Sequence, residues 1–326
     1  MKHFIDLTSL KKSEIESLLV RSEILKSLRK NGIQFKPLTG KAAVLYFEKP
    51  SLRTKVSFDI GIQELGGTTT SLDYNMIAMG EREPVKDVAR TLESYVDAIV
   101  CRIFKHENLY ELSKWSNLSV VNALTDYSHP CQILADFQPL RENNLWKENL
   151  NLVWIGDPNN VLQSWLELAL FYPFSITVSC PEILPEFDYW FQHPELKNRL
   201  TWIKNPVEAV KKADVIYLDT WISMGQEQFA DHKRILYHGY TVNEKLLKSA
   251  PKHVQVLHCL PAKREEEITD TILEKFSDII FQQAQNRLHI QKAIMWELLA
   301  PSIQPDSKMT DSLFEIKEKN YQLAEI

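Results

Sequence analysis

The amino-acid sequence predicts an α/β protein built from two doubly wound parallel sheets joined by helices. Apolar runs of strand length alternate with amphipathic segments along almost the whole chain, a pattern typical of parallel sheets covered by helices on both faces. A length of 326 residues suits two domains of roughly 150 residues each. A polar stretch with few strand-forming residues, at positions 141–149, is the expected boundary between them.

The expected strands are short runs of branched and aromatic apolar residues. They lie at residues 42–47, 98–104, 119–122, 151–155, 175–178, 215–218, 254–257 and 279–281. Helical spacing of apolar residues predicts helices within 85–96, 132–140, 162–171 and 243–249, and a long final helix over 283–299. The polar tail beyond Gln304 is expected to fray.

Bulk composition excludes several classes of protein. Hydrophobic residues make up 44% of the chain and charged residues 25%, as in an ordinary globular protein. The net charge of −5 and the lack of any Lys/Arg run argue against nucleic-acid binding. No apolar stretch approaches the ~18 residues that a membrane span needs, and the N-terminus has no leader pattern. The four cysteines are scattered, which suits a reducing cytosol rather than a disulfide framework or a zinc site.

The most informative motif follows the strand expected at 42–47. Ser51, Arg53 and Thr54 stand at the start of a helical segment, where unpaired backbone N–H groups and the positive end of the helix dipole favour an anion. Two hydroxyls and a guanidinium at that position make a phosphate site that needs no metal. A capping serine followed by a surface arginine would give the same pattern. The helix itself is predicted from the helical spacing of Val56, Phe58, Ile60, Ile62 and Leu65, and Gly66-Gly67 is expected to end it.

Two further cationic or polar groups follow strands of the same half. Arg102 interrupts an apolar run, which indicates a functional guanidinium, although a salt bridge on an edge strand would explain it equally well. His129 and Gln132 flank Pro130 at another expected helix N-terminus, where a purely structural histidine is the alternative. Because open α/β sheets bind ligands at the carboxyl ends of their strands, these residues are expected to converge on one anion, together with Arg287.

A second polar cluster is expected from the other half of the chain. The turn at 156–160 resembles a nucleotide-binding turn but lacks the G-x-G-x-x-G pattern, so a dinucleotide site is disfavoured. The side chains that follow its strands suit a zwitterion, and they are Asn160, Asp219, Ser223 and Cys259. An anion pole facing an amino-acid pole suggests transfer of a group from a phosphate donor to an amine.

Four motifs, in order along the chain, resemble those of the ornithine carbamoyltransferases. They are Ser51-Leu52-Arg53-Thr54, His129-Pro130-Cys131-Gln132, the run from Asp219 to Gly225, and His258-Cys259-Leu260-Pro261. The resemblance extends over roughly residues 3–300. It implies the reaction of carbamoyl phosphate with L-ornithine to give L-citrulline and phosphate, in a cytoplasmic homotrimer or a multiple of trimers, with no cofactor and no metal.

The same resemblance implies a division of the chain. Residues 1–145 would form the carbamoyl-phosphate-binding domain, with a C-terminal helix of about 284–326 packing back on it, and residues 146–283 the ornithine-binding domain. Aspartate carbamoyltransferases normally carry a Pro-Leu-Pro-Arg type segment in place of the Cys-Leu-Pro motif. Putrescine carbamoyltransferases lack the Ser-Met-Gly loop, so the motifs here favour ornithine.

Site roles are carried over from the resemblance position by position. The catalytic residues would be Arg53, Arg102, His129, Cys259 and Asp219, with the last two helping to relay a proton. Carbamoyl phosphate would contact Ser51, Leu52 through its backbone, Arg53, Thr54, Arg102, His129, Gln132, Cys259, Leu260 and Arg287. Ornithine would contact Asn160, Asp219, Ser223 and Met224.

The sequence departs from the family pattern at a few positions near the site. Leu52, Ala78 and Pro158 stand where the family usually has a polar residue, a glutamine and a glycine. Gln283 and Gln285 replace two glutamates of a Glu-Ala-Glu-Asn-Arg pattern. These departures leave two alternatives open, namely a catalytically weak paralogue that binds carbamoyl phosphate and a carbamoyltransferase for another amine.

Overall fold

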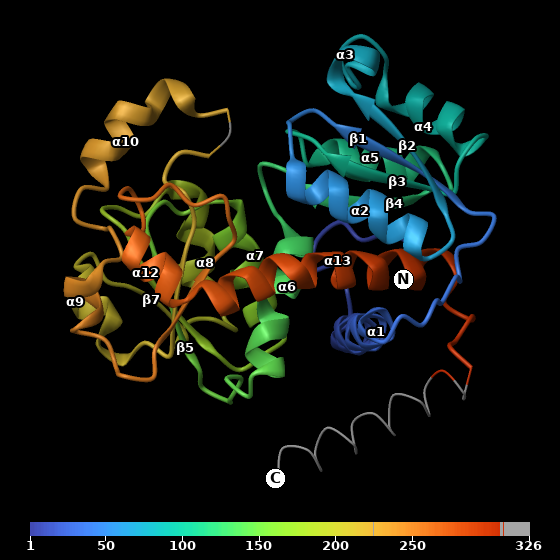
Figure 1. Cartoon of the computed structure of the whole chain (residues 1–326). Coiled ribbons are helices and arrows are strands. Elements are labelled where there is room, and N and C mark those ends of the chain that lie inside the picture. The colour runs from blue at the N-terminus through green and yellow to red at the C-terminus, as the bar shows by residue number, and fades with distance from the viewer. Residues whose placement is uncertain (224, 307–308, 310–326) are drawn as a thin grey trace, which may run out of the picture.

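The computed structural model describes residues 1–223, 225–306 and 309, and within them the chain forms two parallel sheets that lie side by side (Figure 1). Both sheets have helices on their two faces, which confirms the predicted fold class. The first sheet has the strand order β2-β1-β3-β4 and the second β7-β6-β5-β8-β9. The first contains β1 Ala42–Phe47, β2 Thr68–Asp73, β3 Ala98–Arg102 and β4 Ser119–Leu124. The second contains β5 Asn151–Ile155, β6 Ser175–Ser179, β7 Leu200–Trp202, β8 Val215–Leu218 and β9 Gln255–His258.

Helices connect nearly all of these strands. Those of the first half are α1 Lys12–Lys30, α2 Leu52–Glu64, α3 Tyr74–Ile77, α4 Val85–Glu93, α5 Glu107–Trp115 and α6 Pro130–Glu142. Those that follow are α7 Asn160–Ala169, α8 Asp188–Gln192, α9 Pro206–Ala209, α10 Ala230–Leu236, α11 Glu244–Leu247, α12 Asp270–Lys275 and α13 Ser277–Leu299. No helix in the described ranges has the length and apolarity to cross a membrane.

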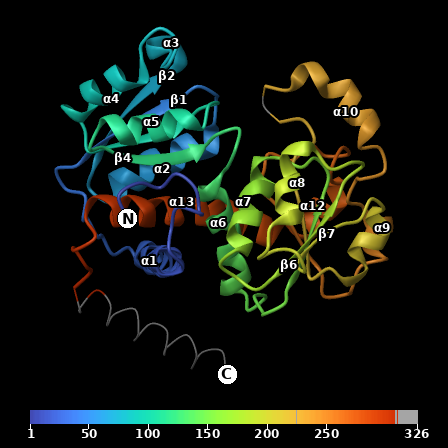
Figure 2. The ribbon, with the colours of Figure 1, turned by 180° about the vertical axis from the view of Figure 1, so that it is seen from behind.

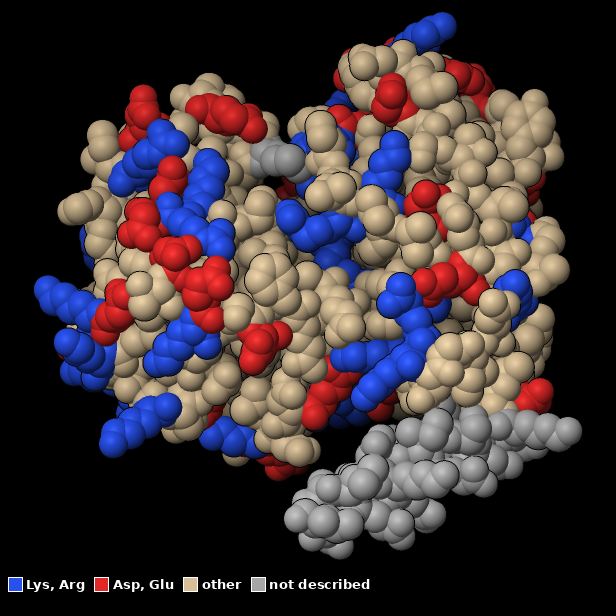
Figure 3. Space-filling model, in the orientation of Figure 1, with Lys and Arg blue, Asp and Glu red and all other residues tan. Residues whose placement is uncertain are grey.

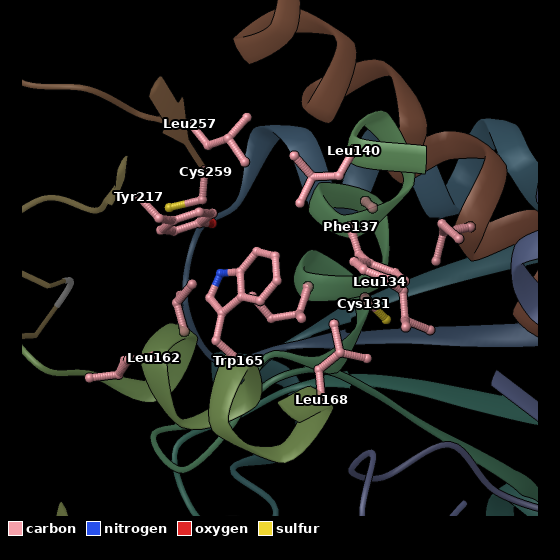
Figure 4. Close-up of a cluster of buried hydrophobic side chains, with 14 of the residues drawn as sticks. Cys131, Leu134, Phe137, Leu140, Leu162, Trp165, Leu168, Tyr217, Leu257 and Cys259 are labelled. Atoms are coloured by element: carbon pink, nitrogen blue, oxygen red, sulfur yellow. The ribbon is translucent and has the colours of Figure 1, made fainter. Parts of the chain in front are cut away.

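Alternation along the strands explains why the first sheet is covered on both faces. Successive side chains of a strand point to opposite faces. In β1, Val44 and Tyr46 pack in a cluster with residues of α4 and α5, whereas Ala43 and Leu45 belong to the large core shared with α1, α2, α6 and α13. That large core continues into the second half, where Phe137 and Leu134 of α6 lie near Trp165 and Leu168 of α7 (Figure 4).

The strand order places a switch point in each sheet. From β1 the chain adds β2 on one side and then returns to add β3 and β4 on the other, so the switch lies between β1 and β3. In the second sheet the same reversal lies between β5 and β8. Ligands of open parallel sheets bind beyond the carboxyl ends of strands at such points. The two switch points therefore predict where a site should lie.

Helix α13 ties the last part of the chain to the first. It contacts α1, α2 and α6 as well as β9, and Figures 1 and 2 show it running from the second half into the first. At Gly61 of α2 an added Cβ would lie 3.0 Å from Cγ of Lys292, so the two helices approach closely there. The expected packing of the final helix on the first half is confirmed for α13. The tail residues 307–308 and 310–326 lie outside the described part of the chain.

Several element predictions need correction. The strand expected at 279–281 is wrong, because these residues belong to α13, which begins six residues earlier than predicted. Strands β2 and β7 and helix α1 were not predicted. Strand β2 is mostly polar and exposed, and both β2 and β7 are edge strands, where strong apolar runs are not required. The chain passes between the two halves at residues 143–150, and the exact domain limits stay a prediction.

Candidate active site

A cleft of about 940 Å³ lies beyond the carboxyl ends of both sheets and is lined by residues of both halves. Figure 3 shows this hollow between the halves, with Lys and Arg side chains inside it. It brings together every predicted site residue that the structure describes, and Met224 lies outside the described residues. The lining includes Ser51, Leu52, Arg53, Thr54, Arg102, His129, Gln132, Asn160, Asp219, Ser223, Cys259, Leu260 and Arg287.

The N-terminus of α2 opens into this cleft. Ser51 occupies the N-cap position, as the capping-serine alternative expects, but its side chain accepts no capping hydrogen bond from the described backbone. The buried Thr54 hydroxyl accepts hydrogen bonds from Arg287 at 2.5 Å and from Arg102 at 3.4 Å. Since both of its lone pairs face guanidinium donors, the Thr54 hydrogen remains to be donated to a ligand.

Arg102 and Arg287 are buried cations. Burial, together with the neighbouring Arg287 and Arg53, lowers the pKa of Arg102 to about 10, so it stays charged at neutral pH. Burial also lowers the pKa of Arg287. Strand β3 is internal, so the edge-strand alternative for Arg102 is wrong, and a bulge between Cys101 and Arg102 re-aims the side chain.

The three guanidiniums are not in direct ion pairs with any carboxylate in the described part of the chain. Among the described carboxylates, none forms an ion pair with Arg53, Arg102 or Arg287, and the Nε atoms of Arg102 and Arg287 are buried without a hydrogen-bond partner in that part of the chain. Buried cations are normally paired. A cluster of three without a carboxylate partner is therefore suited to a multiply charged anion.

His129 lies at the N-cap position of α6, next to the cations. Its backbone N–H donates to Oγ of Ser164 on α7 at 2.8 Å, which fixes the main chain of His129 near the boundary between the two halves. Burial, then the charges of Arg287 and Arg102, lower the pKa of His129 well below its ordinary value. The neutral imidazole has one N–H to donate, and its Nδ1 is buried without a partner among the residues described.

Gln132 links the cation cluster to a buried acid. Its Oε1 accepts a short hydrogen bond from Arg287, and its Nε2 donates to Asp136 at 2.8 Å. Asp136 also accepts a hydrogen bond of 2.5 Å from the hydroxyl of Tyr217. Burial raises the pKa of Asp136 to about 6. This acid was not singled out from the sequence. Through Gln132 and Tyr217 it connects the cluster of guanidiniums to strand β8.

The opposite pole is set by strand register. Leu218 of β8 pairs with His258 of β9, so the next residues, Asp219 and Cys259, leave the sheet side by side. Burial, followed by the charge of Asp219, raises the pKa of Cys259 well above its ordinary value, so the thiol is neutral. Figure 4 shows Cys259 beside the ring of Tyr217.

A metal at this pole would have few ligands. Donor atoms of Asp219, His258 and Cys259 lie within 4.8 Å of one another. However, His258 Nδ1 accepts from the Leu260 backbone at 2.9 Å, and His258 Nε2 lies 3.2 Å from Glu267. Both imidazole nitrogens are therefore used within the protein. The first of these bonds also fixes Leu260, whose φ of 56° is unusual for a residue other than glycine.

Asn160 borders the same pole at the start of α7. Its amide Nδ2 donates to the Thr125 backbone oxygen at 2.6 Å, so its Oδ1 remains to accept a hydrogen bond from a ligand. Ser223, which is half-buried, also lines the cleft. An oxygen acceptor, a carboxylate and a hydroxyl at one end of a cleft suit an ammonium group.

The sequence did not identify Asn159, which precedes Asn160 and contacts Asp219. Asn at the start of a helix that follows a strand also fits an N-cap, and Asn159 does cap α7.

The two departures from the family pattern at positions 283 and 285 have different surroundings in the structure. Gln283 is buried and accepts from the His258 backbone at 3.1 Å, whereas Gln285 is exposed. Ala78 ends α3 with a φ of 46°, away from the cleft lining.

Comparison with known families matches both halves of the chain. Residues 2–142 match the family described as "Aspartate/ornithine carbamoyltransferase, carbamoyl-P binding domain". Residues 148–298 match "Aspartate/ornithine carbamoyltransferase, Asp/Orn binding domain". The two matches together cover most of the chain.

Individual relatives agree with these matches. The chain is 41% identical over 303 residues to an ornithine carbamoyltransferase of Chlorobaculum tepidum, covering 91% of this chain and 90% of that protein. The structure is similar to an ornithine carbamoyltransferase from Pyrococcus furiosus, with a TM-score of 0.85, 34% identity, and coverage of 93% and 98% of the two chains. It is also similar to the anabolic enzyme of Campylobacter jejuni, with a TM-score of 0.83, 36% identity, and coverage of 91% and 99%. The chain therefore belongs to the aspartate/ornithine carbamoyltransferase family.

Proposed function

We propose that this protein transfers the carbamoyl group of carbamoyl phosphate to the δ-amine of L-ornithine, giving L-citrulline and phosphate. The observation that carries the proposal is the pair of poles in one cleft. Three guanidiniums without carboxylate partners among the described residues stand at one pole, and Asp219 with Cys259 stands at the other. An anionic donor and a cationic amino acid are the ligands that such a cleft accommodates together.

The donor phosphate binds at the N-terminus of α2. Its oxygens accept hydrogen bonds from the first backbone N–H groups of the helix, from the Ser51 and Thr54 hydroxyls, and from Arg53. The exposed side chain of Leu52 takes no part, because only its backbone is needed there. Gln132 and Arg287 complete the pocket from α6 and α13.

The carbamoyl carbonyl lies between the two poles. Arg102, the neutral His129 and the Thr54 hydroxyl donate hydrogen bonds to its oxygen, and these bonds strengthen as that oxygen gains negative charge. Cys259 and Leu260 line the other side of the reacting carbon. A neutral thiol beside Asp219 is a weak donor and acceptor, so Cys259 orients the amine rather than attacking the carbonyl.

Ornithine occupies the second pole. Asp219, Oδ1 of Asn160 and the Ser223 hydroxyl receive its α-ammonium and fix the amino-acid end of the molecule. We include Met224 in the binding of the α-carboxylate on the basis of the family motif alone. This arrangement leaves the δ-amine as the end that reaches the carbamoyl carbon.

The reaction requires the δ-amine to lose a proton before it attacks. An alkylammonium has a pKa near 10.4 in water, and a site beside several cations favours the neutral form. The amine lone pair forms the new C–N bond and places negative charge on the carbonyl oxygen. Collapse breaks the C–O bond to phosphate, which leaves as an anion at the α2 N-terminus. The proton remaining on nitrogen is then lost to the Asp219 carboxylate, with the neutral Cys259 thiol relaying it.

We also propose that the protein assembles as a homotrimer in the cytosol. On α2, Leu52, Val56 and Ile60 are 77%, 51% and 40% exposed and recur every four residues, so they form an apolar stripe on the solvent side of the helix. A second copy of the chain is the partner that would cover the stripe, and analytical ultracentrifugation should give three times the chain mass. The four cysteines, none in a disulfide, suit a reducing compartment.

The test of the proposed reaction is formation of carbamoylated product from carbamoyl phosphate with ornithine, putrescine, aspartate and N-acetylornithine as parallel acceptors. Citrulline from ornithine, with the other three acceptors inactive, is the expected result. A preference for another acceptor would keep the donor site and refute the assignment of the second pole. Binding of carbamoyl phosphate with no turnover of any acceptor would instead identify a non-catalytic paralogue.

A further inference from the structure

Asn159 uses both ends of its side-chain amide. Its Oδ1 accepts hydrogen bonds from the backbone N–H groups of Val161 at 2.9 Å and Leu162 at 3.3 Å, which caps α7. Its Nδ2 donates to Oδ2 of Asp219 at 2.8 Å. The orientation of the amide is fixed by chemistry, because only the oxygen can accept from the two backbone donors and only the nitrogen can then face the carboxylate.

The carboxylate of Asp219 is held from two sides. Its Oδ1 accepts from the Thr220 backbone at 2.7 Å, and its Oδ2 accepts from Asn159. Each carboxylate oxygen has a further lone pair, so the two bonds fix the plane of the group and leave acceptor capacity for a ligand. A hydrogen bond to a charged group is about twice as strong as one between neutral groups.

The backbone that presents Asn159 is itself constrained. Ile155 of β5 pairs with Leu218 of β8, so the turn after β5 lies beside Asp219 at the switch point of the second sheet. In that turn, Gly156 has a φ of 112°, and an added Cβ would lie 3.1 Å from the Trp221 ring. Pro158 is the residue just before Asn159, and its ring fixes its own φ angle. A conformationally restricted turn therefore holds the side-chain amide of Asn159 next to Asp219.

We propose that Asn159 is the positioning residue of the acceptor pole, which orients the Asp219 carboxylate toward the ammonium of the amino-acid substrate. This inference rests on the proposed function. Asn159 acts through Asp219 and contacts none of the donor-pocket residues by a hydrogen bond among those described, so its removal weakens the binding of the acceptor and leaves the binding of the donor unchanged. A residue that only capped α7 would instead affect the stability of the helix and both substrates alike.

The test separates the two roles of the side chain. Asn159→Ser and Asn159→Asp both keep an oxygen that caps α7, and both remove the amide Nδ2 that donates to Asp219. The serine leaves only a hydroxyl on a shorter side chain in its place, and the ionised aspartate has no donor at all. We expect the KM for ornithine to rise by about 10-fold or more in each variant, the scale of one lost hydrogen bond to a charged group. The KM for carbamoyl phosphate should stay within about 2-fold of the wild-type value, and the melting temperature should not change.

Asn243 provides the matched control. It caps α11 by accepting from the Leu246 backbone at 2.9 Å and does not line the cleft, so Asn243→Ser should leave both KM values unchanged. An unchanged ornithine KM in both Asn159 variants, or an equal rise in both KM values, would refute the positioning role. Failure of the wild-type protein to form citrulline would refute the proposed function and this inference together. If the wild-type protein does form citrulline, a negative result with the Asn159 variants refutes the positioning role alone.

Discussion

At the scale of single residues, Thr54 organises the anion pole with one hydroxyl. It accepts from the guanidiniums of Arg102 and Arg287, which come from a strand and a helix far apart in the sequence. Arg53 is the third cation of this group and the one at the helix N-terminus itself. It is half-buried, and its charge affects the pKa of both other arginines.

Arg53→Ala tests whether this cation acts on the reacting phosphate. We expect kcat/KM for carbamoyl phosphate to fall by about 10²–10³, the range observed when one donor to a developing charge is removed. Steady-state kinetics with both substrates varied would measure it. Lys55→Ala, which removes an exposed cation from the same turn, should change kcat/KM by less than about 2-fold. Turnover of Arg53→Ala at the wild-type rate would show that the phosphate binds elsewhere.

The sequence was sufficient to select many of the residues that line the cleft, but it left their contacts open. Ser51, Arg53 and Asp219 could be selected because parallel strands end at one edge of a sheet, so polar residues after strands converge. Asp136 and Asn159 could not, because each has an ordinary local explanation as a buried helix residue or an N-cap. Their importance depends on which side chains the two halves bring together, and no local pattern encodes that.

At the scale of elements, the approach of α2 to α13 determines whether Thr54 reaches Arg287. Gly61 permits this approach, because an added Cβ would meet Lys292 at 3.0 Å and Leu288 at 3.4 Å. The two contacts lie on one side of α2, two turns from its N-terminus. An added Cβ at position 61 therefore requires the Lys292 side chain to shift by a few tenths of an ångström, and a larger side chain requires more.

Gly61→Val should separate the two helices. We expect a loss of about 1–3 kcal/mol in the free energy of unfolding and a weaker donor site, because the Thr54–Arg287 hydrogen bond lengthens. Urea unfolding and the KM for carbamoyl phosphate are the measurements. Gly61→Ala is the graded control, since it adds only the Cβ and gains about 1 kcal/mol in helix propensity. Equal KM values in all three proteins would contradict the proposed dependence of the pocket on helix packing.

Elements with a strong apolar pattern were predicted well, and those without one were not. The limits of β1, β5 and β8 agree with the prediction because internal parallel strands are buried on both faces. Strand β2 was not predicted because it is an edge strand, which does not need apolar residues, and its residues Thr68–Asp73 are mostly polar. The false strand at 279–281 has the opposite cause, since a buried helix also contains consecutive apolar residues.

At the scale of the whole molecule, Glu167 joins the two halves. It lies on α7, is fully buried, and accepts a hydrogen bond of 3.1 Å from the backbone N–H of Leu7, in the N-terminal segment. Burial, with a contribution from the charge of Asp6, raises the pKa of Glu167 from 4.5 to about 8. The folded state therefore binds this proton more tightly than the unfolded chain does.

The sign of the pH dependence follows from that difference. The stability associated with Glu167 is fully present below pH 4.5 and is lost as the pH rises to about 8. Glu167→Gln does not titrate, so its free energy of unfolding should decline less between pH 5 and 8, by a few kcal/mol. Urea unfolding across this pH range would measure both curves. The exposed control Glu195→Gln should follow the wild-type curve, and parallel curves for Glu167→Gln would contradict the assignment.

The path of α13 has a consequence for how the protein is made. Thr54 and Arg287 are 233 positions apart, yet they share one hydrogen bond in the anion pocket. During translation the first sheet leaves the ribosome long before α13, so a nascent chain cannot hold a complete pocket, however well that sheet has folded. A ligand stabilises only the folded state that binds it. Carbamoyl phosphate should therefore stabilise chains that contain α13 against unfolding, and it should not stabilise chains that end before α13.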